Sequence, residues 1–334
     1  MPRKGTYRPF LIAVVALLAF ALLFVIAGLN GWWEPASNEK AVGEASRWCE
    51  RVSPGIMREP INSLGNLAFI VSGLGMLLVL ARDTKHDKSR VNPFIGNQPI
   101  ALLYAGATIY LGPGSMLMHG SNTTFGAWAD NLSMVMYILI PWIYNLTIMG
   151  RWRDRTFFVT YGLVVAGFAI GYWFFGSGLG INLDLFGVSI ALWLISELLY
   201  RFWSQPLRWL SGLLGFVIAA VFGITPADML ADPWEHWWVI LFWLPGLAAT
   251  TAPDSHRRYW PWFPAGVIAF LSAYAVWTTG VPDHHSCDPD GLFQAHAVWH
   301  LLTAAATWFF FLFLRTQRLS TSDVDNSKSD SNLT

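Results

Sequence analysis

Two short motifs place histidines at a spacing that suits metal binding. His296 and His300 are four residues apart (HAVWH), and Ser115 and His119 have the same spacing (SMLMH). On a helix, side chains at i and i+4 lie on one face, so each pair points in one direction. One helix can thus give two imidazoles to a single ion, as in other zinc enzymes. Three imidazoles form a typical catalytic zinc shell, whose fourth position is open to water.

An acidic residue, Asp130, adds a group that can carry protons (AWADNLSM). Each of these residues also has a structural interpretation. A histidine pair can hydrogen-bond a neighbouring helix, a helical serine usually bonds a carbonyl of the preceding turn, and an aspartate near a helix end can face water. Ionisable groups inside apolar spans are costly and generally functional, so the combined set favours a metal centre.

The elements that position these residues are apolar stretches long enough to cross a membrane. Hydrophobic residues make up 54 % of the 334-residue chain and charged residues 13 %, against about 25 % in ordinary soluble domains. A span needs about 20 apolar residues. The sequence predicts an all-α, polytopic transmembrane helical bundle with ten candidate spans: 9–29, 60–81, 99–119, 126–149, 156–176, 184–203, 207–225, 234–252, 261–280 and 293–315.

The distribution of lysine and arginine predicts the orientation, because these residues collect in short cytoplasmic loops. With the N-terminus inside, the outer segments near 120–125, 177–183, 226–233 and 281–292 contain neither residue. The outer loop 30–59 is the exception, and its four basic residues are offset by five glutamates. An even number of spans follows, with both termini cytoplasmic in a multi-pass inner (plasma) membrane protein.

This topology brings the chemical groups to one depth. His119 lies near the outer end of its span, Asp130 near the outer start of the next, and His296 and His300 near the outer start of the last. Nothing in the spacing of the residues required this agreement. We therefore expect a site that faces the periplasm or the exterior.

The two ends of the chain differ in character from its middle. Residues 1–29 begin with a short basic segment and continue into a long apolar run without a small-residue cleavage site, which favours an uncleaved signal anchor over a cleaved signal peptide. An extracytoplasmic loop at 30–59 precedes the transmembrane bundle at 60–316. The tail at 317–334 is rich in Ser and Asp and is expected to be disordered.

Cys49 and Cys287 are the two cysteines, and both fall on the outer side of the predicted topology. Disulfides persist in such compartments. A bridge would join the loop after the first span to the loop before the last. The alternative is two unrelated thiols.

The order Ser-x-x-x-His, Asp, His-x-x-x-His resembles the alkaline ceramidase family, which belongs to a superfamily of seven-span membrane hydrolases that includes the adiponectin and progestin receptors. The local sequence agrees: Trp48, Cys49 and Glu50 are similar to the family's W-C-E, NSLGNL at 62–67 to its N-T-x-S-N-L, and HAVWHLLT at 296–303 to its last span. The resemblance covers roughly 47–149 and 285–316 and implies a bacterial-type member with a seven-span core and an extra N-terminal span.

The resemblance implies a role for each residue. His119, His296 and His300 would hold Zn²⁺, which lowers the pKa of water and polarises the scissile carbonyl. Asp130 would take the proton of the water and pass it to the leaving amine. Ser115 would stabilise the oxyanion. The substrate would be ceramide or another N-acyl membrane lipid, cleaved to a fatty acid and a sphingoid-type amine.

Two departures from the family are visible. Glu50 and Glu59 match positions that hold calcium in the animal enzymes, but Arg47 and Val52 replace an Asp and an Asn there. Calcium favours many oxygen ligands, so a Ca²⁺ site is doubtful, and the alternative is a solvated loop. The middle of the chain is also longer than in the family. It contains either two additional spans or interfacial or re-entrant helices within 207–252.

Other classes of function follow less well from the sequence. The formal net charge is zero and no basic cluster with interleaved aromatics lies outside the spans, which excludes nucleic acid as an expected partner. No protein partner can be inferred. The alternatives are a lipid esterase or phospholipase, a receptor-like lipid sensor with a structural zinc, and a transporter, although transport predicts a mid-membrane site and an internal repeat.

Overall fold

The fold is a bundle of helices with one very small β-ladder. The structure is a computed structural model that describes residues 6–33, 42–86 and 92–319. Most of the predicted disordered tail and the first residues of the signal anchor lie outside this range. Seven helices in the described part are long and apolar enough to span a membrane. The chain is therefore an all-α, multi-pass membrane protein.

The chain divides into two compact units. Residues 1–133 and 258–317 form the first unit. Its elements are α1 (Arg8–Leu29), α2 (Pro60–Gly65), α3 (Leu67–Lys85), α4 (Pro99–Ser121), the first part of α5 (Thr124–Met149), α12 (Trp262–Trp277) and α13 (Ala295–Leu314). Residues 134–257 and 318–334 form the second unit. Its elements are the rest of α5, α6 (Asp154–Phe175), α7 (Leu185–Phe202), α8 (Gln205–Leu210), α9 (Leu213–Val221), α10 (Pro226–Ala231), the 3₁₀ helix η1 (Trp237–Trp243), α11 (Leu244–Ala248), β1 (Ser255–His256) and β2 (Arg318–Leu319).

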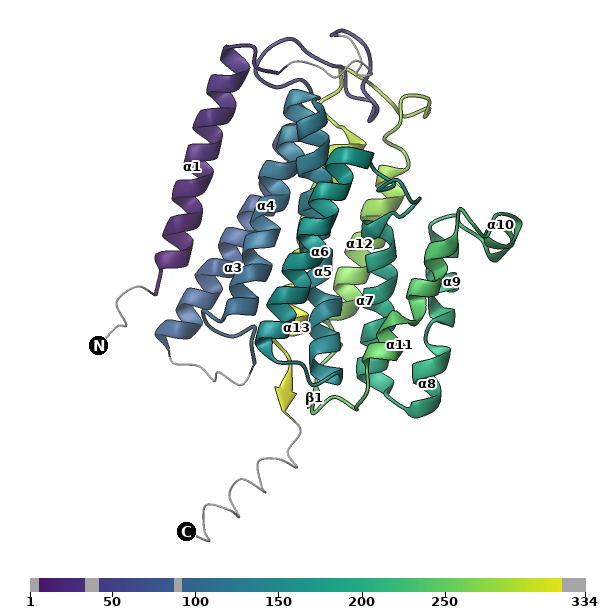
Figure 1. The fold of residues 1–334 in the computed structure, drawn as a ribbon. Coiled ribbons are helices and arrows are strands. Elements are labelled where there is room, and N and C mark those ends of the chain that lie inside the picture. Colours follow the sequence, from purple (N-terminus) through teal and green to yellow (C-terminus); the bar gives the residue numbers. More distant parts are fainter. Residues whose placement is uncertain (1–5, 34–41, 87–91, 320–334) are drawn as a thin grey trace. The chain divides into compact units, whose positions relative to one another are not determined.

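Glycines bring α3 and α4 into close contact in the first unit (Figure 1). A Cβ on Gly73 would lie 2.4 Å from Ile109 of α4, and one on Gly112 would lie 2.5 Å from Ile70 of α3. Small residues at a helix interface let backbones approach where lipid offers no hydrophobic driving force between helices. The outer half of α4, which carries Ser115 and His119, is therefore held firmly against α3.

Helix α13 is held along its length by α12, α3 and α4. It runs beside α12 (Figure 1), while the hydroxyl of Ser72 on α3 donates to the carbonyl of Ala304 and that of Tyr104 on α4 to the carbonyl of Thr307. At the end of α13 remote from its histidines, Arg315 forms an ion pair with the buried Asp83 over 2.6 Å. These bonds fix the depth at which His296 and His300 lie.

The terminal helix α1 touches the same unit at its outer end. Most of its residues are exposed, but Phe24 is buried and fills the space where Gly120 of α4 lacks a side chain. Gly28 lies against Ile56, whose carbonyl accepts a hydrogen bond from the indole of Trp33. The predicted first span is thus also packed against the chain that surrounds His119.

Three of the ten predicted spans are not single helices, and the first, 60–81, is divided into α2 and α3 at Asn66. The stretch 207–225 is divided into α8 and α9 at Ser211–Gly212, and 234–252 consists of η1 and α11. Gly212 and Gly215 lie against Trp243 and Phe242, so the short helices pack on each other. The sequence left two additional spans or interfacial or re-entrant helices open for 207–252, and this stretch contains none of the seven long apolar helices. The stretch 261–280 contains α12, which has 16 residues and is shorter than the seven long helices.

A buried polar cluster organises the second unit. Arg257 donates to Oε2 of Glu197 on α7 and to the side-chain carbonyl of Asn145 on α5, each over 2.8 Å. The guanidinium also lies over the ring of Tyr200, whose hydroxyl is 2.7 Å from that of Ser255. A paired charge is tolerable in an apolar interior where a lone charge is not. The cluster joins α5, α7 and β1 within this unit.

Candidate metal centre

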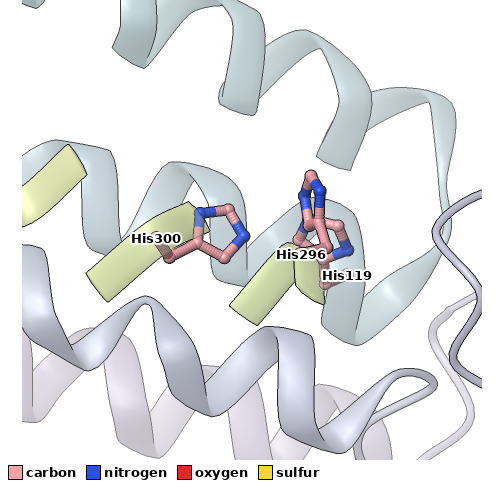
Figure 2. Close-up of side chains that lie close together, drawn as sticks. All are labelled: His119, His296 and His300. Atoms are coloured by element: carbon pink, nitrogen blue, oxygen red, sulfur yellow. The ribbon is translucent and has the colours of Figure 1, made fainter. Parts of the chain in front are cut away.

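Three buried imidazoles meet at the outer end of α4 and the start of α13. His119, His296 and His300 are each at most 5 % exposed, and one ring nitrogen from each lies within 4.8 Å of the others (Figure 2). Nε2 of His119 and Nε2 of His296 are 3.0 Å apart. Two nitrogens bound to one tetrahedral zinc are separated by about 3.3 Å, because each Zn–N bond is about 2.0–2.1 Å long. The spacing fits a shared ion.

Several buried polar atoms at this place have no hydrogen-bond partner among the described residues. They are Nδ1 of His296, Nε2 of His300 and Oγ of Ser115. An unsatisfied polar atom in an apolar interior is costly, so each such atom in a stable protein needs an explanation. A cation held among the three rings accounts for a buried imidazole nitrogen without a hydrogen-bond partner, such as Nε2 of His300. The residues present therefore fit a zinc ion.

Ser115 and Asp130 lie beside the histidines, as the sequence predicted. Ser115 precedes His119 by one turn of α4 and is buried. The Asp130 carboxyl, on α5, is close enough to interact with both the His119 imidazole and the Ser115 hydroxyl. Gly114 permits this approach, since a Cβ there would lie 2.7 Å from Cβ of Ser133 on α5. All five predicted residues thus meet at one site.

Glu59 also belongs to the site, although the sequence suggested only a doubtful calcium position or a solvated loop for it. Its Oε2 lies 2.7 Å from Nδ1 of His119, and the side-chain amide of Asn62 donates to the same oxygen over 2.9 Å. A carboxylate only accepts, so Nδ1 carries the hydrogen and Nε2 presents a lone pair toward His296. Glu59 and His119 are 60 residues apart, and only their shared outer position hinted at contact.

Glu50 and Glu59 are buried, so the interpretation as solvated loop carboxylates is wrong for both. The two oxygens of Glu50 accept hydrogen bonds from the backbone N–H groups of Ile61 and Asn62, over 2.7 and 2.8 Å. Burial raises the pKa of Glu50, and these two N–H groups oppose that shift. The carboxylates thus bind α2 and His119 within the protein.

The loop before α2 covers the site at the start of α13. The indole of Trp48 stacks on the His296 ring, with centroids 4.4 Å apart and planes inclined by 12°. The neighbouring residue, Cys49, forms a disulfide with Cys287. Arg51 makes a two-pronged ion pair with Asp290, over 2.7 and 2.8 Å. The loop is therefore fastened on both sides of Trp48 to the segment that leads into α13.

Comparison with known proteins agrees with this arrangement. A family model described as Ceramidase matches residues 44–332, which include every residue of the site. The chain belongs to the ceramidase family. The match begins after α1, so this helix lies outside the residues that match the family model.

Two curated proteins show a more limited likeness to this ceramidase-family chain. Both are described as high osmolarity signaling protein sho1, one from Pyrenophora tritici-repentis and one from Pyrenophora teres f. teres. Each is 29 % identical over 120 residues, or 34 % of this chain. The chain spans 39 % and 38 % of their lengths, less than half of either.

Proposed function

We propose that this protein is a zinc-dependent intramembrane amidase that hydrolyses the N-acyl bond of ceramide or a ceramide-like lipid. Membership of the ceramidase family supports a ceramide-hydrolysing activity, and the observation that carries the metal is the buried set of three histidines. The products are a fatty acid and a sphingoid-type amine. An ester of similar shape is the nearest competing substrate.

His119, His296 and His300 would hold the ion. A zinc ion bound there supplies a Lewis acid and lowers the pKa of water. The Asp130 carboxylate accepts a proton from the attacking water and returns it to the departing amine nitrogen, which leaves as a neutral amine. The buried Ser115 hydroxyl donates to the carbonyl oxygen as negative charge develops on it.

The proposed site faces the periplasm or the exterior, and both termini are cytoplasmic. The charge distribution supports this orientation, because the segments beside the site lack lysine and arginine apart from the loop 30–59. The disulfide beside Trp48 is also consistent with an oxidising compartment. An epitope inserted between His284 and Ser286 should be accessible to antibody on intact spheroplasts, and one inserted at Arg153 should become accessible only after permeabilisation.

The deciding experiment measures bound metal and turnover on the same detergent-purified protein. Wild type should contain about one zinc per chain and release fatty acid from at least one member of a panel of ceramides and other N-acyl lipids, with O-acyl lipids as controls. His300→Ala should lose both properties. His285→Ala, an exposed histidine in the neighbouring loop, should retain both.

The outcomes separate the candidate functions. Faster cleavage of O-acyl lipids than of any amide would make the protein an esterase or phospholipase. Zinc binding without turnover would favour the lipid-sensing alternative. Folded wild type that binds no zinc would contradict the metal centre itself.

A further inference from the structure

We infer that Glu59 is a positioning residue for the metal centre: it orients His119 and holds this ligand in the tautomer that can bind an ion. The inference rests on the proposed zinc site and adds to it a residue outside the histidine set. It assigns Glu59 to the histidine and not to a separate cation.

The side chains of Glu59 and His119 are in direct contact and are shielded from water. The 2.7 Å separation of Oε2 and Nδ1 lies at the short end of the range for charge-assisted bonds, and both side chains are at most 4 % exposed. Water therefore does not compete for either partner. Because Nδ1 is occupied by its hydrogen, His119 can bind an ion only through Nε2, the atom that faces His296.

Glu59 is itself fixed from three directions. Its backbone N–H donates to the carbonyl of His119 over 3.0 Å, so main chain and side chain both join the same residue. Asn62 donates to the carboxylate, and the neighbouring N–H of Arg58 donates to the carbonyl of Gly120. The carboxylate thus has a defined position relative to the outer end of α4.

Metal-bound histidines commonly donate their second ring N–H to a carboxylate, which fixes the ring and makes it a stronger ligand. His296 has no such acceptor among the described residues, since its Nε2 faces His119 and its Nδ1 lacks a hydrogen-bond partner. No carboxylate among the described residues contacts His300, whereas Glu59 contacts His119. Of the three ligands, His119 is therefore the one whose donor atom the protein orients by a carboxylate. We expect it to dominate the affinity for zinc.

The test compares zinc affinity in Glu59→Gln, Glu59→Leu and wild type, by competition with a chromophoric chelator. Removing a partner of this kind typically weakens metal binding about 10–100-fold, and Glu59→Leu should show a loss of this size. Glu59→Gln can still accept a hydrogen bond from His119 through its amide oxygen and should retain part of the zinc affinity that Glu59→Leu loses. Glu50→Gln is the matched control, because Glu50 is a buried carboxylate of the same loop that bonds backbone N–H groups instead of histidine.

A spectroscopic measurement separates positioning from general support of the fold. In the Co²⁺-substituted protein, Glu59→Leu should shift and weaken the visible d–d bands, whereas Glu50→Gln should leave them as in wild type. If wild type binds zinc and Glu59→Leu binds it equally well with an unchanged cobalt spectrum, the inference is wrong while the proposed function stands. If wild type binds no zinc, the proposed function fails first. Equal losses in Glu59→Leu and Glu50→Gln would reduce Glu59 to a loop-packing role.

Discussion

At the scale of residues, the site concentrates polar atoms in a place where the surrounding helices offer them few partners. His296 is stacked under Trp48, and His300 has the ring of Phe69 near its edge, with centroids 6.1 Å apart. Aromatic walls exclude water without supplying strong hydrogen bonds. An ion held here would therefore interact mainly with its ligands and with the substrate, in surroundings where electrostatic effects are large.

The catalytic role of Asp130 should be separable from metal binding, because Asp130 lies beside His119 but does not belong to the group of residues that could hold the ion. We expect Asp130→Asn to retain zinc and to lose about 10²–10⁴-fold in kcat, the usual contribution of a positioned acid–base group. Metal analysis and steady-state hydrolysis of the best substrate from the lipid panel test this. An Asp130→Asn protein that turns over at the wild-type rate would remove Asp130 from the mechanism.

Glu50 should make the free energy of unfolding of the protein depend on pH. Its pKa is raised above 4.5 in the folded protein, so the folded state binds the proton more tightly than the unfolded state does. The free energy of unfolding should therefore fall as pH rises from about 4.5 toward the raised value, and level off above it. In Glu50→Gln this part of the slope should disappear. Thermal unfolding in detergent at a series of pH values provides the measurement, and an unchanged slope would contradict the assignment.

The residue types and their spacing predicted the five residues that the structure brings together, since ionisable groups in apolar spans are rare and have few structural uses. Glu59 could not be assigned in the same way. Its contact with His119 depends on how the loop before α2 meets the end of α4, and no periodicity encodes a loop path. The resemblance to animal enzymes also directed attention to a calcium interpretation for this residue.

At the scale of elements, the approach of α4 to α5 decides whether Ser115 and His119 reach Asp130. Gly114 is one point of close approach: a Cβ there would also lie 2.9 Å from the carbonyl oxygen of Ala129. Gly126, at the start of α5, is another, because a Cβ there would lie 2.4 Å from the carbonyl oxygen of Leu117. The small residues of α4 and α5 are therefore part of the site's geometry.

Gly114→Val should separate these helices and misplace the acid–base group. A displacement of about 1 Å can cost about 10²-fold in rate, and we expect a loss of at least that order in kcat/KM. Gly106→Ala is the control on the same helix, because a Cβ at Gly106 meets nothing within 4 Å. It should leave turnover unchanged. Loss of activity in both variants to the same degree would point to helix α4 as a whole and not to its contact with α5.

The apolar patterns predicted long helices well, because about 20 apolar residues have few other stable arrangements in a bilayer. The same patterns did not predict the breaks within 207–225 and 234–252. Hydropathy alone registers the composition of these stretches but not the interruptions at Ser211–Gly212 and Pro245, or the aromatic residues that let η1 pack on α9. Such short helices depend on partners from distant sequence.

At the scale of the whole molecule, the outer loop is attached to the last helix by covalent and ionic links that flank Trp48. The disulfide joins residues 238 positions apart, so it connects the loop before α2 to the segment before α13. The Arg51–Asp290 pair is exposed and lowers the pKa of Asp290, but surface pairs of this kind contribute little to stability. The disulfide should therefore be the stronger link.

Reduction should lower the melting temperature of wild type to that of Cys287→Ser, since removing a native disulfide typically costs about 2–5 kcal/mol. The melting temperature of Cys287→Ser should not change on reduction, so this variant serves as the control for other effects of the reductant. Thermal unfolding with and without reducing agent, with thiol titration to confirm reduction, provides the measurement. If fully reduced wild type melts at the original temperature, the bridge does not stabilise the fold.

The histidine cluster draws on residues that are made at very different times. His119 is 177 residues before His296, and His296 and His300 both belong to the last helix. A growing chain therefore holds a single one of the three imidazoles through most of its synthesis and insertion. The cluster forms only when the final helix enters the bundle, so an incomplete or arrested polypeptide lacks the complete set of three histidines.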